Sequence, residues 1–325
     1  EYPNMGSWPR TEWGKAATFM HSRGEVCSFL QSSAYYWMNE FHFDGLRMDA
    51  VGNLIYWQGD ASRGENLAAL KFIRTMNQGL KERIPDCLLF AEDSTPYQGV
   101  TKPVWEGGLG FDYKWDLGWM HDTLSYFQAD AKERQEKYHK LTFSMMYFYN
   151  ERYILPLSHD EVVHGKATIA QKMNGGYDGE NFPQARAFYM YMYAHPGAKL
   201  NFMGNELAQL KEWCEKDELD WILLKFPVHE AFHKFMADLN QCYLKNSAFS
   251  KRDFSQDGFS WVDCHQEQKC MYLFERISGD QKILAVFNFS DEIQEYTLEK
   301  DYAGYELLLA SDMVKYGGKK RYTKK

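Results

Sequence analysis

An alternation of short apolar runs with helical patterns limits the folds that this chain can adopt. The apolar runs have the length of buried strands and cover residues 43–48, 87–91, 111–115, 153–157 and 199–203. The helical patterns cover residues 22–41, 67–80, 184–194 and 229–245, and SRGE at 22–25 fits a capping box. Alternation of this kind predicts parallel strands joined by helical crossovers.

The pattern changes after about residue 250. Short apolar segments separated by Gly, Asp and Ser follow at 259–262, 271–277, 282–289, 293–298 and 305–309. Several short strands with turn residues between them predict an all-β domain. We therefore expect an α/β portion at residues 1–248 and a C-terminal all-β domain at residues 249–325.

Acidic side chains follow four of the predicted α/β strands. They are Asp49, Glu92, Asp93, Asp160, Glu161 and Glu206. A single acid in such a place is more often a structural ion pair, a helix cap or an exposed loop residue. Four strands that all end in acids favour a shared site, because parallel strands of a barrel present their carboxyl ends at the same mouth.

Residues 44–49 explain how charges can follow a buried strand. Side chains alternate along a strand, so Arg47 and Asp49 share one face while Leu46 and Met48 share the other. Three carboxylates around one cavity suit the cleavage of a glycosidic bond, in which one attacks the sugar and one protonates the departing oxygen. Arg47 would orient the carboxylate of Asp49 and keep it charged.

Several longer motifs carry a family resemblance. DGLRMDAV (44–51), LLFAEDST (88–95) and LPLSHDEVVHGK (155–166) resemble conserved regions II, III and IV of the α-amylase superfamily, glycoside hydrolase family 13. GLGFDYKWDLGWMHDTL (108–124) and NFMGNELAQ (201–209) resemble one subgroup, the bacterial-type 1,4-α-glucan (glycogen) branching enzymes. The resemblance covers essentially the whole chain.

The resemblance implies roles for five residues. Asp49 would be the nucleophile, Glu92 the general acid/base and Asp160 the third acid, while Arg47 and His159 would contact the same sugar. The family cleaves an α-1,4 link in an α-glucan and transfers the chain to a 6-hydroxyl, without a cofactor. The fold implied is a partial (β/α)8 barrel, strands four to eight, followed by a β-sandwich.

One departure from the family leaves alternatives open. Region I and barrel strands one to three have no counterpart, and residue 1 falls in what resembles the segment after strand three, so we expect a truncated chain. Five strands of eight leave open sheet edges and an incomplete sugar site. An α-1,4-glucan hydrolase and an inactive glucan-binding remnant therefore stay open beside a branching enzyme.

Composition limits the partners and the compartment. The net charge of −8 argues against nucleic acid and anionic membranes, which both favour a basic face, and no run of eighteen apolar residues is present. The six isolated cysteines indicate a reduced, cytoplasmic protein, and the spacing of Cys264, His265 and Cys270 matches no usual zinc site. Oligomeric state, acceptor preference and the length of the transferred chain leave no sequence signal.

Overall fold

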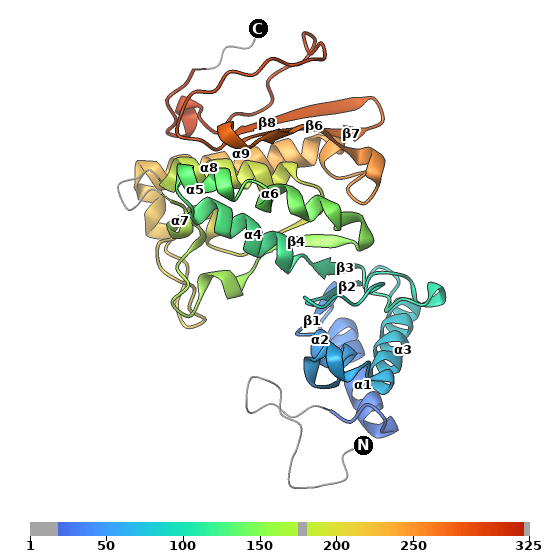
Figure 1. The fold of residues 1–325 in the computed structure, drawn as a ribbon. Coiled ribbons are helices and arrows are strands. Elements are labelled where there is room, and N and C mark those ends of the chain that lie inside the picture. Colours follow the sequence, from blue (N-terminus) through green and yellow to red (C-terminus); the bar gives the residue numbers. More distant parts are fainter. Residues whose placement is uncertain (1–18, 175–180, 322–325) are drawn as a thin grey trace. The chain divides into compact units, whose positions relative to one another are not determined.

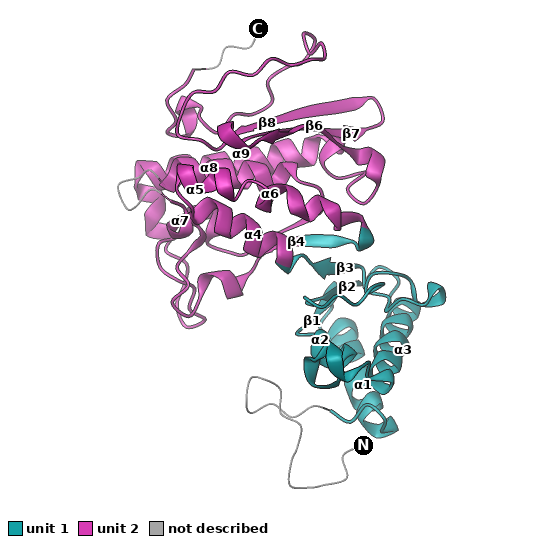
Figure 2. Ribbon diagram, viewed as in Figure 1, with its two compact units in different colours: residues 1–117, 150–154 teal, residues 118–149, 155–325 magenta. Residues whose placement is uncertain are grey.

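The computed structural model describes residues 19–174 and 181–321, and the chain divides into two compact units (Figure 2). Unit 1 consists of residues 1–117 and 150–154, and unit 2 consists of residues 118–149 and 155–325. Residues 1–18, which include the start of the chain that resembles the segment after barrel strand three, lie outside the described part. The predicted boundary at residues 248 and 249 stays a prediction.

Unit 1 alternates helices and parallel strands (Figure 1). Its helices are α1 (Gly24–Glu40), α2 (Gly52–Ile55) and α3 (Leu67–Arg83), and its strands are β1 (Gly45–Met48), β2 (Leu88–Ala91), β3 (Tyr113–Trp115) and the start of β4 (Tyr153–Leu157). β1 pairs with β2 from Gly45–Leu88 to Met48–Ala91, and β2 with β3 and β3 with β4 are also parallel. The predicted strands and the helices predicted at 22–41 and 67–80 are confirmed here, whereas the short helix α2 was not predicted.

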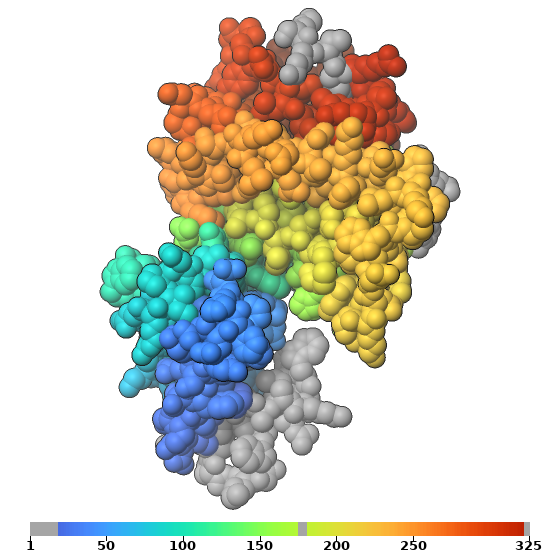
Figure 3. Space-filling view, turned by 180° about the vertical axis from the view of Figure 1, so that it is seen from behind, coloured from blue at the N-terminus to red at the C-terminus, as the bar shows by residue number. Residues whose placement is uncertain are grey.

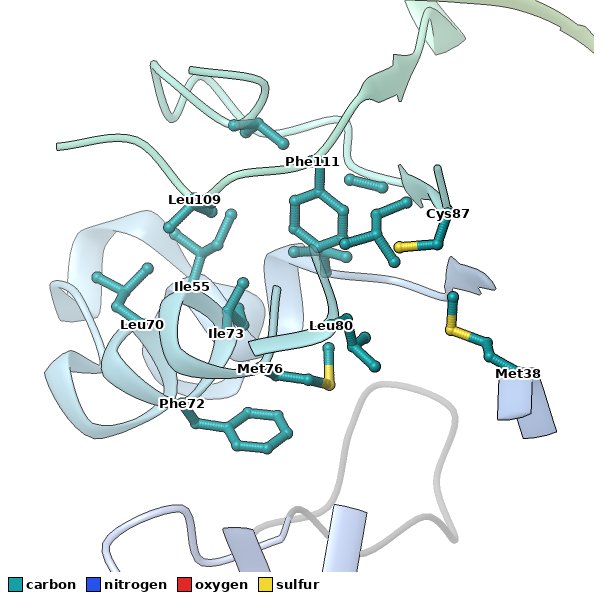
Figure 4. Close-up of a cluster of buried hydrophobic side chains, with 14 residues drawn as sticks. Met38, Ile55, Leu70, Phe72, Ile73, Met76, Leu80, Cys87, Leu109 and Phe111 are labelled. Carbon is teal, nitrogen blue, oxygen red and sulfur yellow. The ribbon is translucent and has the colours of Figure 1, made fainter. Parts of the chain in front are cut away.

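A cluster of apolar side chains forms the core of unit 1 (Figure 4). α3 contributes Leu70, Ile73 and Leu80 from one face, and Ile55 and Leu109 pack against them. Burying each such side chain contributes about 1.5–3 kcal/mol, so the helical spacing decides which face of α3 turns inward. Asn66 begins the helix, because its side-chain oxygen accepts the Ala69 N–H at 3.2 Å.

Two local predictions in unit 1 are wrong. Leu67, which the helical pattern counted among the apolar positions, is 71% exposed in the first turn of α3. The expected capping box at Ser22–Glu25 does not form: α1 begins after Arg23, which makes no side-chain capping hydrogen bond. The apolar spacing located both helices. It did not predict that the first residue of α3 is exposed, or how the backbone N–H groups at the start of α1 are bonded.

Unit 2 holds the remaining helices and strands. Its helices are α4 (Leu117–Gln128), α5 (Ala131–Glu136), α6 (Lys140–Phe143), α7 (Ile169–Lys172), α8 (Asn181–Ala194) and α9 (Pro227–Lys245). Its strands are the end of β4, β5 (Ala198–Asn201), β6 (Phe259–Gln266), β7 (Met271–Ser278) and β8 (Gln281–Asn288). One sheet has the order β1-β2-β3-β4-β5 and the other β6-β7-β8, so the predicted partial β/α barrel and all-β C-terminal region are confirmed.

The all-β region contains one antiparallel sheet in the described residues. β7 and β8 form a hairpin across Gly279 and Asp280, and Gly279 has the positive φ (58°) that such a short turn favours. The strands predicted at 293–298 and 305–309 are wrong, since neither segment is a strand. An apolar pattern forms a strand only where a neighbouring strand offers its backbone, and Ile293 instead is 86% exposed.

Two buried arginines join the β strands of unit 2 to its helices. Arg276 on β7 is fully buried, donates to Ala194 O at the end of α8 (2.7 Å), and pairs with Asp253. Arg134 on α5 donates to Phe289 O just after β8 (3.0 Å). Each guanidinium satisfies backbone carbonyls that would otherwise be buried without a donor.

α9 lies beside the C-terminal part of the same unit, as the neighbouring orange and red surfaces of Figure 3 show. Asp238 on α9 accepts hydrogen bonds from Lys315 Nζ (2.8 Å) and Tyr316 Oη (2.6 Å). These bonds tie Lys315 and Tyr316 to α9, although the described residues after β8, 289–321, form no strand. Within residues 19–174 and 181–321, no helix has the length and apolar character needed to cross a membrane.

His195 is a buried histidine directly after α8. It is 1% exposed, with Nε2 at 2.9 Å from Ser144 Oγ and Nδ1 at 2.7 Å from Pro196 O. Burial lowers the pKa of His195 from 6.5 to about 3, because the imidazolium would lose its water there. The folded state therefore resists protonation of this ring.

This lowered pKa predicts a pH dependence of stability. The folded-state pKa lies below the unfolded one, so the contribution of His195 is fully present above pH 6.5 and is lost as the pH falls toward 3. Between pH 7 and pH 5, the free energy of unfolding of the wild type should fall by about 2 kcal/mol more than that of His195→Gln.

Urea denaturation at the two pH values measures this difference. His139→Gln is the matched control, because the His139 side chain is 66% exposed and its contact with Glu267 lies at the surface, so this substitution should change the pH dependence by less than about 1 kcal/mol. An identical pH dependence in His195→Gln and the wild type would contradict the prediction.

Candidate active site

Parallel pairing of β1 with β2 places the acids of unit 1 beside each other. Glu92 N donates to Met48 O at 3.0 Å, and Val51 N donates to Glu92 O at 2.8 Å. These two bonds hold the residues that follow the two strands in register, so Asp49 and Glu92 leave the sheet at the same edge. Leu46 and Met48 pack against the core cluster, as the alternation predicts.

Arg47 contacts both predicted catalytic carboxylates of unit 1. Its NH2 nitrogen lies 2.8 Å from Asp49 Oδ1 and also pairs with Glu92 Oε2. Its guanidinium lies 4.4 Å from the centre of the Trp115 ring at the end of β3, a favourable cation–π contact. The sequence predicted the pairing with Asp49, whereas Trp115 and the second pairing, with Glu92, were missed.

The two carboxylates differ in their exposure. The Asp49 side chain is 74% exposed and that of Glu92 is 20% exposed. Both carboxylates contact the same Arg47 nitrogen, so they are close neighbours. Retaining glycosidases also need two neighbouring carboxyl groups, one as nucleophile and one as general acid/base.

Asp93, the acid next to Glu92, has a structural role. Its side chain is fully buried and lies 2.8 Å from Lys114 Nζ on β3. It also accepts the Thr95 N–H at 3.1 Å and the Thr95 hydroxyl at 3.0 Å. The Asp93 carboxylate is therefore bonded to groups inside the protein, whereas the Glu92 side chain is partly exposed.

His159 and Asp160 lie together in unit 2, directly after β4. Asp160 Oδ1 is 3.5 Å from His159 Nε2, and their side chains are 42% and 38% exposed. Ser158 and Glu161 form a capping box, in which Glu161 Oε2 accepts the Ser158 N–H at 2.6 Å. Glu161 therefore accepts a hydrogen bond from the backbone, whereas the side chains of Asp160 and His159 are partly exposed to solvent.

Two aromatic rings lie near His159. The Phe202 ring centre lies 5.9 Å and the Trp213 ring centre 6.1 Å from that of His159. The sequence did not point to Trp213, because its segment matches neither a strand nor a helix pattern. Glu206, expected at the end of β5, accepts the Gly204 N–H at 2.9 Å and so serves the local turn.

The structure thus places the five predicted site residues in two groups. Arg47, Asp49 and Glu92 meet in unit 1, and His159 and Asp160 meet in unit 2. Their convergence on a single sugar stays a prediction. Across the described part of the chain, no group of three or more His, Cys, Asp or Glu side chains is arranged to hold a metal ion.

Comparison with known proteins identifies the relatives of this chain. It is 42% identical over 332 residues to the 1,4-alpha-glucan branching enzyme GlgB of Shewanella baltica. It is 40% identical to the protein of that name from Oceanobacillus iheyensis and 39% identical to that from Geobacillus stearothermophilus. Each match covers 98% of this chain. The chain belongs with the bacterial 1,4-alpha-glucan branching enzymes.

Two further matches agree with this membership. Residues 261–325 match the family described as alpha amylase, C-terminal all-beta domain. A solved cyclomaltodextrinase has the same fold over 82% of this chain and 40% of its own, with a TM-score of 0.54 and 17% identity. The chain spans about half the length of the curated branching enzymes that it matches, between 44% and 52% for these three.

The contrast between Asp93 and Glu92 yields a stability prediction. Asp93→Asn leaves the Lys114 ammonium buried without a countercharge, so the free energy of unfolding of unit 1 should fall by about 3 kcal/mol. Glu92→Gln changes a partly exposed ion pair and should cost less than about 1 kcal/mol. Urea denaturation of the two variants measures both values. A loss at Glu92 as large as that at Asp93 would contradict these separate roles.

Proposed function

We propose that the protein to which this chain belongs is a glucan branching enzyme that acts on α-1,4-glucans. The observation that carries the proposal is the pairing of Asp49 and Glu92 through Arg47, in a chain similar over 98% of its length to curated branching enzymes. Its proposed place is glycogen biosynthesis in the cytoplasm, which agrees with its six free cysteines.

The proposed reaction proceeds in two displacements. The Asp49 carboxylate attacks C1 of the glucose at the cleaved link, the C1–O4 bond breaks, and Glu92, which must carry a proton at this step, gives that proton to O4. The 6-hydroxyl of an acceptor chain then attacks C1 and releases Asp49, while Glu92 takes the proton of that hydroxyl. Two inversions at C1 keep the α configuration, and the product is an α-1,6 branch.

Asp160 and His159 are proposed to contact the sugar at the same C1. The transition state carries positive charge on the ring, and a carboxylate near the ring hydroxyls stabilises it. The 42% exposure of the Asp160 side chain leaves it available to a ligand. The Phe202 and Trp213 rings beside His159 would add the flat apolar faces on which sugar rings pack.

An assay on linear amylose tests the proposed activity. The chain is incubated alone, and also with the part of the Shewanella baltica relative that it does not match. A branching enzyme changes the iodine stain and forms α-1,6 links, detected after enzymatic debranching, with little gain in reducing ends. A gain in reducing ends without new branches would identify a hydrolase instead. No reaction in either mixture would overturn the proposal.

The nucleophile assignment predicts the site of a covalent intermediate. The test uses whichever of the two mixtures is active. In it, a fluorinated glucosyl fluoride should leave a glycosyl adduct on Asp49, detected by mass spectrometry of peptides. Asp49→Asn should form no adduct and should lower kcat by at least about a thousandfold. Asp44→Asn in the same motif is the control and should retain the adduct. An adduct on another residue would refute the assignment.

A further inference from the structure

The segment after Asp160 has an unusual backbone. His164, Gly165 and Ala167 have φ angles of 59°, 78° and 65°. Glycine adopts such angles freely, but each non-glycine residue there costs about 1 kcal/mol or more. Two strained residues within four positions persist only where neighbouring groups hold them.

Glu212 is the group that holds this segment. Its Oε2 accepts the Gly165 N–H at 2.9 Å and its Oε1 accepts the Ala167 N–H at 2.6 Å. The next residue, Trp213, donates its own N–H to Val162 O at 3.0 Å. Three hydrogen bonds therefore join two stretches that lie about fifty residues apart in sequence.

The chemistry of a carboxylate suits this task. The two N–H groups each need an acceptor, and both oxygens of an ionised carboxylate are acceptors. These two bonds lower the pKa of Glu212, so the ionised form is the one that the segment stabilises. A glutamine has the same shape but offers one acceptor and one donor, and it would leave one N–H without an acceptor.

The held segment is connected to Asp160. Lys166 lies between the two N–H groups that Glu212 binds, and its Nζ donates to Asp160 O at 2.8 Å. Lys172 Nζ donates to Ala167 O at 2.5 Å and also to Glu161 O. A change in the backbone at 164–167 therefore moves donors that hold the carbonyls of Asp160 and Glu161.

We propose that Glu212 is a positioning residue for the sugar-binding pair Asp160 and His159, acting through residues 163–167. The carboxylate maintains the strained backbone, and this backbone carries Lys166 to the main chain of Asp160. The expected effect on catalysis rests on the proposed function. The two hydrogen bonds from Gly165 and Ala167 to Glu212, called the clamp below, do not depend on it. The substrate class is that of the proposed site, an α-1,4-linked glucose chain.

Amide hydrogen exchange at residue resolution tests the clamp on the 325-residue chain. Glu212→Gln should exchange at least tenfold faster than the wild type at Gly165 or Ala167, and also at Asp160, whose N–H donates to Ser158 Oγ at 3.2 Å. Glu215→Gln is the matched control, because Glu215 is exposed in the same segment, and it should leave these rates unchanged.

A second variant guards against general unfolding. Glu212→Asp keeps both acceptors on a side chain shorter by one methylene, so exchange should accelerate less than in Glu212→Gln. The amides of β7 serve as an internal reference and should keep their wild-type rates in both variants. Wild-type exchange at Gly165 and Ala167 in Glu212→Gln would overturn the clamp. Faster exchange there with no change at Asp160 would overturn the positioning role.

Kinetics in the active form then test the link to the reaction. A small displacement of Asp160 should lower kcat about 10- to 100-fold and change KM less than threefold, as is typical when a residue supporting a catalytic group is lost. An unchanged kcat in Glu212→Gln would overturn the proposal while leaving the proposed function intact. If the wild type shows no activity, the proposed function fails, and the exchange rates still decide the clamp.

Discussion

The parallel pairing of β1 with β2 is the interaction on which the candidate site depends. It brings the residue after one strand beside the residue after the other, with backbone hydrogen bonds at Met48 and Val51 to Glu92. The side-chain alternation of β1 then leaves Arg47 at the same edge as Asp49, where a single nitrogen contacts both carboxylates. A shift of one residue in this register would turn Arg47 toward the core and separate the pair.

Acidic residues that are neighbours in the sequence have different roles because their surroundings differ. Glu92 and Asp93 are adjacent, but Asp93 is fully buried against Lys114, while Glu92 is partly exposed at Arg47. The same division recurs after β4, where Glu161 caps the local backbone and Asp160 faces solvent. In each case one acid secures the end of the strand, and the other is left available for chemistry.

Unit 2 uses charged side chains as acceptors and donors for its own backbone. Arg276 and Arg134 donate to carbonyls at the end of α8 and just after β8, and Glu212 accepts two N–H groups of the segment after Asp160. Buried or strained backbone groups need such partners because no water or regular ladder supplies them. These three residues thus support irregular segments of this unit through hydrogen bonds to their backbone.

The sequence by itself determined the order of the five parallel strands and of α1, α3, α8 and α9, the all-β region after residue 250 and the likeness to branching enzymes. It did not point to α2 or to the helices from α4 to α7. It also located Arg47, Asp49, Glu92, His159 and Asp160, because apolar periodicity and motif wording are local properties of the chain. The roles of these residues and their gathering around one sugar stay predictions.

Only the tertiary structure decided which side chains meet across distant segments. Three such contacts left no signal in the spacing of residues, since each joins segments that are separated by other elements. They are the contacts of Trp115 with Arg47, of Lys114 with Asp93, and of Glu212 with the segment after Asp160. The segments 293–298 and 305–309 fail as strands for the same reason. A strand requires a partner whose position no local pattern records.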